Sequence, residues 1–316
     1  MTGRGRAGRV AAVLLAAHPA FAATDAAPSP DAAAFARHAE MDLGTGNDEQ
    51  AIRDATEALA REPNFVEALL FRGRAYFEEQ KYDLAIQDFG RMIAINPAIG
   101  QAYYYRGWAE AGKAQYDLAL ADLDQTIKLL PSWGRAYNER GWINSAAQRY
   151  ERAILDLTEA IRLEPDLAEA FGNRGIAYRA IGDYDKAAAD FDRALALRPS
   201  YLGVWNGRGL LFSMRGDEER ALADFSQAIE LRPNDVNAYQ YRAWIEFKLG
   251  RLEPAAADFA TVLRLTPRNA TGFYGRSLVK MAKGDKSGAE SDLAAARQLL
   301  PDIEQQVATW RQKWGF

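Results

Sequence analysis

Residues Ala168–Tyr201 read AEAFGNRGIAYRAIGDYDKAAADFDRALALRPSY, and seven other stretches of the chain repeat this pattern without a gap. Each copy carries a proline near its end, always 34 residues after the previous one. These prolines are Pro63, Pro97, Pro131, Pro165, Pro199, Pro233, Pro267 and Pro301. A fixed period of this size indicates stacked supersecondary units. We therefore predict eight repeats, at 32–65, 66–99, 100–133, 134–167, 168–201, 202–235, 236–269 and 270–303.

The columns of the repeat indicate two closely packed helices in each unit. Position 20 is alanine and position 23 is aspartate in all eight copies, while position 8 is always Gly, Ala or Ser. In the copy at 168–201, Gly182 and Asp183 separate two helical segments, predicted at 168–181 and 184–197. Pro199 ends the second helix because proline lacks the donor that the next turn requires. Polar residues at position 33, such as Asp166, are expected to cap the helix that follows.

These residues resemble the tetratricopeptide repeat, whose pattern combines a large residue, a small residue, tyrosine, alanine, phenylalanine and proline at fixed positions. The copy at 168–201 matches the pattern at Phe171, Gly175, Tyr178, Ala187, Phe191 and Pro199. The resemblance covers about nine-tenths of the chain. It implies an all-α, right-handed superhelical solenoid of eight 34-residue helix-turn-helix repeats.

The last residues of the chain predict a further helix. Ile303, Val307, Trp310 and Trp314 share one helical face, which favours a C-terminal capping helix, assigned to 304–316. Such a helix would close an end of the solenoid that otherwise exposes apolar surface.

An arginine column distinguishes this chain from many members of the family it resembles. Position 7 is arginine in seven repeats, and an aspartate follows each arginine after sixteen residues. The arginines are Arg72, Arg106, Arg140, Arg174, Arg208, Arg242 and Arg276. Two hypotheses fit: a ladder of cations for an anionic ligand, or a repeated ion pair between the two helices. Because a partly buried arginine should be paired, we favour the ion pair.

The N-terminus has the features of a secretory signal at Met1–Ala22. Three arginines precede a short apolar run, and small residues flank Phe21 as in a cleavage site. The run is too short to span a bilayer, so we expect no transmembrane segment in the mature chain. Cleavage after Ala22 would give a periplasmic or secreted protein beginning with a linker at 23–31. The alternative is an unstructured basic leader on a cytoplasmic protein.

Composition argues against several function classes. Removing residues 1–22 takes away three arginines and no acid, so the net charge moves from −4 to −7, and nucleic acid is an unfavourable ligand. The absence of cysteine excludes disulfides, thiolate metal sites and a cysteine nucleophile. A single histidine, His38, follows the predicted signal, which is too few for a metal cluster or a convincing triad. We expect no enzyme activity and no cofactor or metal.

The resemblance implies a concave groove lined by positions 2, 5, 6, 9, 12 and 13 of each first helix. These positions hold large amphipathic side chains and amides, which suit an extended peptide. The candidate binding residues are Tyr104, Tyr105, Trp108, Asn138, Trp142, Asn173, Arg179, Asn206, Gln240, Tyr241, Trp244, Phe247 and Tyr274. The tryptophans at position 9 could instead pack against the neighbouring repeat.

The sequence therefore predicts a non-enzymatic scaffold or adaptor that binds a protein or peptide partner in the groove. Two alternatives stay open. The same aromatic residues would suit sugar rings, which predicts a glycan-binding module of the cell envelope. The ends of the solenoid could also associate with each other and form an oligomer.

Overall fold

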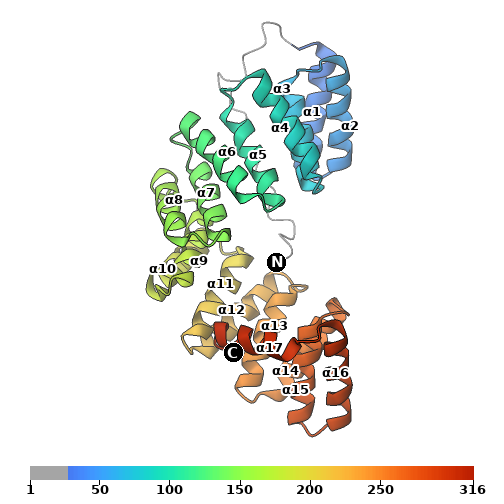
Figure 1. The fold of residues 1–316 in the computed structure, drawn as a ribbon, viewed down its shortest axis with the longest axis vertical. Helices are drawn as coiled ribbons and strands as arrows, with labels where there is room; N and C mark the ends of the chain where they lie inside the picture. The colour runs from blue at the N-terminus through green and yellow to red at the C-terminus, as the bar shows by residue number, and fades with distance from the viewer. Residues whose placement is uncertain (1–27) are drawn as a thin grey trace. The chain divides into compact units, whose positions relative to one another are not determined.

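The computed structural model describes residues 28–316, which form seventeen helices and no strands (Figure 1). The helices are α1(Pro30–Thr45), α2(Asp48–Arg61), α3(Val66–Glu78), α4(Tyr82–Ile95), α5(Gly100–Gly112), α6(Tyr116–Leu129), α7(Gly134–Ala146), α8(Tyr150–Leu163), α9(Ala168–Ala180), α10(Tyr184–Leu197), α11(Leu202–Met214), α12(Glu218–Leu231), α13(Val236–Lys248), α14(Leu252–Leu265), α15(Ala270–Ala282), α16(Lys286–Leu299) and α17(Ile303–Trp314). The predicted signal at 1–22 and most of the linker lie outside the described residues. The first helix begins at Pro30, two residues before the predicted start of the repeats.

The chain divides into two compact units, which we describe separately. Unit 1 ends at Glu164 and contains α1 to α8, and unit 2 begins at Pro165 and contains α9 to α17. In both units an odd-numbered first helix packs against the even-numbered second helix of the same repeat. The all-α helical repeat solenoid is therefore confirmed. In the repeat at 168–201 both helices start at the predicted residues, and the first ends one residue early, at Ala180.

Close packing explains the small residues of the repeat. The position-20 alanines are fully or almost fully buried in all eight repeats. At position 8, a Cβ added to Gly175 would lie 2.8 Å from the ring of Phe191, so the two helices leave no room for a side chain there. Phe191 itself is fully buried in the core of unit 2. These contacts fix the distance between the two helices of a repeat.

The turn between the two helices places position 15 in the left-handed region. Gly182 has a φ of 84°, and glycine holds the same position in the last three repeats. Gln80, Ala114 and Gln148 adopt φ values of 59° to 60° at the equivalent turns of unit 1. Because a Cβ disfavours this conformation, these three turns are strained relative to those with glycine.

The predicted caps at position 33 are wrong for the first helices. The N-cap of α9 is Leu167 rather than Asp166, and it provides no side-chain acceptor. Side-chain caps occur at three first helices, α1, α13 and α15, and at three second helices, α10, α12 and α16. At α10, Asp183 accepts a hydrogen bond from the backbone N–H of Lys186. The repeat turn places position 34, rather than position 33, at the helix start.

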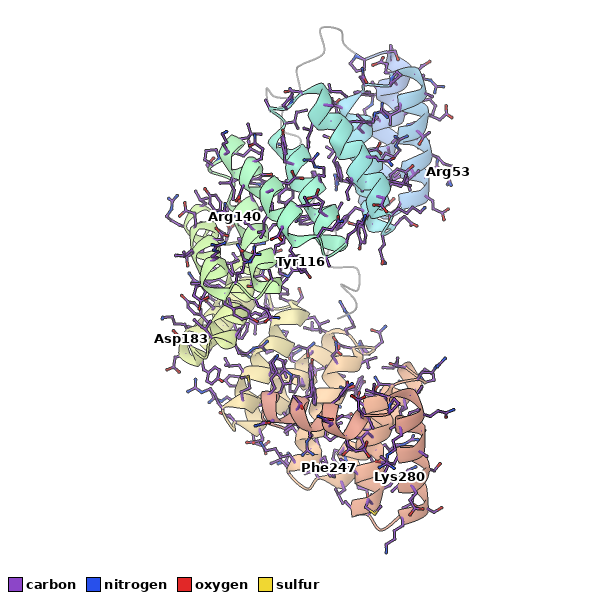
Figure 2. The ribbon with its side chains drawn as sticks, in the orientation of Figure 1. Arg53, Tyr116, Arg140, Asp183, Phe247 and Lys280 are labelled. Atoms are coloured by element: carbon purple, nitrogen blue, oxygen red, sulfur yellow. The ribbon has the colours of Figure 1, made fainter. Side chains whose placement is uncertain are left out.

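The ion-pair hypothesis for the arginine column is confirmed in all seven repeats. Each arginine donates from Nε and Nη2 to both oxygens of the aspartate sixteen residues later, at 2.6–3.1 Å. Four arginines also reach back to the preceding repeat. Arg72 and Arg242 donate from Nη1 to the hydroxyl oxygens of Thr56 and Ser226, at 3.3 and 3.0 Å. Arg140, labelled in Figure 2, donates from Nη1 to Asp124 at 2.7 Å, and Arg208 donates to Asp192 at 2.6 Å. The pairs therefore join the helices within repeats and some repeats to their neighbours.

Candidate functional site

The candidate site is the surface that positions 2, 5, 6, 9, 12 and 13 of the first helices form in each unit. We call this surface the first-helix face. Within unit 1, α3 contacts both α1 and α5, and within unit 2 contacts connect α9, α11, α13 and α15 in order. Residues at equivalent positions of successive first helices therefore lie beside one another, as a binding surface for a long ligand requires.

An aromatic cluster occupies this face in unit 1. Tyr104 is 3% exposed, and its ring centroid lies 4.5 Å from Trp133 and 5.3 Å from Trp108. Tyr105 is also buried and stacks on Phe89 of the core at 5.6 Å. Both predicted tyrosines thus take part in packing, while Trp108 remains half-buried.

Polar groups surround this cluster. Asn138 is buried and donates from Nδ2 to Oε1 of Glu139 at 3.0 Å. The guanidinium of Arg74 lies 5.8 Å from the ring of Tyr105. Burial raises the pKa of Tyr105, and the charges of Arg74 and Arg135 partly oppose that shift. The sequence prediction omitted these two arginines, although both occupy face positions (9 and 2) that could have identified them.

In unit 2 the first-helix face contacts a segment of the chain itself. The C-terminal helix α17 packs against α11 and α15, and Figure 1 shows it in red beside α13. Trp310 stacks on Tyr241 with centroids 5.8 Å apart, and Phe316 stacks on the same ring at 6.0 Å. Ile303 and Val307 are buried in the same core cluster. The helix was predicted to close the end of the solenoid, but contact with α11 places it along the first-helix face.

Side chains of the face also bind the backbone at the end of α17. Ser213 donates from Oγ to the carbonyl oxygen of Trp314 at 2.9 Å, and Lys248 donates from Nζ to that of Gly315 at 2.6 Å. Gly315 has a φ of 75°, and an added Cβ would lie 2.5 Å from the carbonyl oxygen of Ser213. Glycine is therefore required here both by the backbone conformation and by the close approach to α11.

Arg179 reaches this segment from α9. Its Nη1 donates to the carbonyl oxygen of Gly207 at 2.9 Å, and its guanidinium lies 4.8 Å from the ring of Trp314. Burial lowers the pKa of Arg179 to about 10. Within residues 28–316 no carboxylate forms an ion pair with it, so a buried positive charge is left without a counter-charge.

The remaining predicted residues of unit 2 divide between core and surface. Trp244 is fully buried, with its ring 5.1 Å from Phe259, so the packing alternative describes this tryptophan. Phe247 and Tyr274 lie within 6.4 Å of the Trp244 ring and are half-buried. In unit 1, Trp142 is half-buried and packs against the core of that unit. The amide residues have different partners. Asn206 donates to Asp235 at 3.3 Å, Gln240 accepts from Thr271 at 2.8 Å, and Asn173 is half-buried on α9.

Glu110, outside the first-helix face of unit 1, has a strongly shifted pKa. Glu110, on α5, is 8% exposed and adjacent to the Arg106–Asp122 pair. Burial, and secondly the charge of Asp122, raise the pKa of Glu110 to about 7. Because the unfolded value is 4.5, this carboxyl group lowers the free energy of unfolding progressively as the pH rises from about 4.5 to about 7.

Neither a metal centre nor a membrane span emerges from the described residues. Across residues 28–316, His, Asp and Glu nowhere gather in threes that could hold a metal ion. In the same range, every helix is too short or too polar to cross a bilayer.

Comparison with known proteins identifies the family. A family model described as the tetratricopeptide repeat matches residues 38–99, 104–168 and 242–302, and two related models with the same description match 168–201 and 202–235. The chain belongs to the tetratricopeptide repeat family. No curated protein matches it as a relative.

Solved tetratricopeptide structures share this fold at low sequence identity. A chain of the APC/C hetero-tetramer Cut9–Hcn1 gives a TM-score of 0.68 at 16% identity, over 78% of this chain and 48% of that one. This chain thus spans about half the length of that structure. A tetratricopeptide repeat protein from Parabacteroides merdae gives 0.62 at 18% identity, covering 85% and 99%. The Pseudomonas aeruginosa protein PilF gives 0.59 at 18% identity, covering 67% and 97%. Proteins built of tetratricopeptide repeats are typically non-enzymatic scaffolds for protein–protein interaction.

Proposed function

We propose that this protein is a scaffold that holds an extended peptide segment of a partner protein on the first-helix face of unit 1. One observation carries the proposal. In unit 2 the equivalent face already contacts a peptide segment, α17, through Arg179, Tyr241 and Lys248 at face positions. The face thus offers the contacts that a peptide needs: aromatic surface for side chains and polar groups for backbone carbonyls.

The chemistry of unit 1 suits the same kind of ligand. Trp108 and Trp142 offer large rigid surfaces with few rotatable bonds, which lowers the entropy cost of binding. Asn138 is buried and already donates to Glu139, so a peptide backbone would have to replace that contact in order to pair with its amide. Arg74 adds positive charge to this face of an otherwise acidic protein, whereas the charge of Arg135 is shared with Glu164, whose Oε2 lies 3.8 Å from Arg135 Nε. We expect the partner segment to combine aromatic or aliphatic residues with acidic ones.

The N-terminal sequence supports a site of action outside the cytoplasm. The basic start, the short apolar run and the small residues around Phe21 support export followed by cleavage after Ala22. We therefore propose a periplasmic or secreted scaffold, and we expect its partner to be a protein of the cell envelope.

The experiment is a binding screen of the full chain on peptide and oligosaccharide arrays. Peptide hits should bind the Trp108→Ala/Trp142→Ala variant at least tenfold more weakly, because both aromatic surfaces are lost. Tyr137→Ala serves as the matched control, since Tyr137 is an aromatic residue of α7 at position 4, off the face. Binding to sugars alone, or peptide binding unaffected by the double substitution, would contradict the proposal.

A further inference from the structure

We propose that residues 303–316 act as a displaceable occupant of the first-helix face of unit 2. In this arrangement the segment covers a second binding surface until an amphipathic helix of similar chemistry replaces it. The inference goes beyond the proposed function, because it concerns unit 2 and a helical ligand, and it can fail while peptide binding by unit 1 stands.

The contacts of this segment are those of a bound ligand. Trp310 and Phe316 lie beside each other, with ring centroids 4.9 Å apart, and both stack on one receiving residue, Tyr241, with interplanar angles of 18° and 17°. The guanidinium of Arg311 lies 5.1 Å from the ring of Trp244. Aromatic anchors on a central receiving residue are typical of peptide hot spots.

The polar side chains of the face bind backbone atoms at the end of α17 and not its side chains. Ser213 and Lys248 donate to the last carbonyl oxygens of the helix, which have no partner within a helix. Any helix that ends at this place would offer the same two acceptors. The face is therefore suited to helices in general, and the aromatic anchors select among them.

Several polar groups at the contact between α17 and the face are imperfectly satisfied. Nε1 of Trp244, on the face, and Nε of Arg311, on α17 itself, are buried without a hydrogen-bond partner. Arg179 has one backbone acceptor and an aromatic ring, but no carboxylate within the described chain. Buried donors without partners weaken an association, because the cost of removing them from water is not recovered. A ligand that supplied acceptors here would compete with α17.

The connection to α16 compensates for this imperfect fit. Three residues, Leu300, Pro301 and Asp302, separate the end of α16 from the start of α17. A segment tethered so closely has a high effective concentration at its site, so it can occupy the face with modest intrinsic affinity. An untethered partner must offer better contacts. We infer that this partner is an amphipathic helix with aromatic residues four positions apart, like Trp310 and Trp314, and a carboxylate placed to meet Arg179.

The test uses a fluorescein-labelled synthetic peptide of residues 302–316 and the full chain, followed by fluorescence anisotropy. The variant Trp310→Ala/Gly315→Val weakens the tethered segment and leaves the receiving face unchanged. Gln305→Ala/Gln312→Ala, on the exposed side of the same helix, is the matched control. The peptide should bind the weakened variant at least about tenfold more tightly than it binds the wild type or the control, because the site is vacated.

Two further measurements complete the test. Adding Tyr241→Ala to the weakened variant should abolish peptide binding, and binding that persists would overturn the proposal. Hydrogen exchange of the wild-type chain should show α17 exchanging faster than α15, as expected of a segment that opens alone. Equal protection of the two helices, or equally weak peptide binding by all variants, would show that α17 is a fixed part of the core.

Discussion

Arg174 and Asp190 form two parallel hydrogen bonds across the two helices of the fifth repeat, from Nε and Nη2 to the two carboxylate oxygens, each 2.8 Å long. Asp190 is 6% exposed, and the hydrogen bond to it is the main cause that raises the pKa of Arg174. The same pair recurs in the six other repeats that carry the arginine. The geometry fixes how the first helix of a repeat sits on the second.

Replacing Asp190 with alanine should destabilise the protein by up to roughly 3–5 kcal/mol, the value for complete burial, because it leaves a partly buried arginine without its counter-charge. Urea unfolding followed by circular dichroism measures the change. Asp185→Ala is the control, since that aspartate is 90% exposed in its pair with Arg215 and should contribute less than about 1 kcal/mol. If Asp190→Ala left the unfolding midpoint unchanged, the arginine–aspartate pairs would not stabilise the repeats as we propose.

Glu110→Gln should stabilise the protein increasingly as the pH rises. The folded-state pKa of about 7 lies above the unfolded value of 4.5, so folding favours the protonated acid. The penalty is absent below about pH 4.5, grows through the interval to pH 7 and is then constant, at up to about 3 kcal/mol. Unfolding free energies at pH 5 and pH 8 measure this difference. Equal effects of Glu110→Gln at both pH values, as expected for the exposed control Glu290→Gln, would contradict it.

At the turn position with positive φ, replacing alanine with glycine and glycine with alanine should change the stability in opposite directions. Ala114→Gly should stabilise unit 1 by about 0.5–1 kcal/mol, because glycine adopts the φ of 59° without a Cβ penalty. Gly182→Ala should destabilise unit 2 by about 1–2 kcal/mol, although no atom lies within 4 Å of the added Cβ. Thermal unfolding of both variants tests the account, and shifts of the same sign would refute it.

The proposed export predicts the N-terminus of the native protein. Cleavage after Ala22 leaves a chain that begins at Ala23. N-terminal sequencing of protein isolated from its natural source, after separation of envelope and cytoplasm, measures this directly. A cytoplasmic chain that begins at Met1 or Thr2 would show that the basic leader is retained.

The sequence predicted the features that depend on one repeat. Arg174 and Asp190 could be paired because sixteen residues separate them in every copy, and helix starts at Ala168 and Tyr184 follow from the same period. The prediction of N-caps at position 33 was wrong because the turn shifts the helix start by one residue. The preference of Asp166 for N-cap positions carries no information about that shift. The predicted position of α17 differs from the structure for another reason. Its apolar stripe specified that Trp310 would be covered, but the choice between the end of α16 and the ring of Tyr241 depends on tertiary packing.

The central claim is that partners bind the first-helix face, and photo-crosslinking tests it most directly. Benzoylphenylalanine would replace Trp142 on α7 or Leu155 on the exposed side of α8, where 71% of the residue is accessible. Each full-length variant would be irradiated with an array-selected peptide, and mass spectrometry would locate the crosslinks. We predict that the peptide crosslinks at position 142 and not at position 155. Crosslinks at position 155 alone would place the binding surface on the second helices and contradict the account.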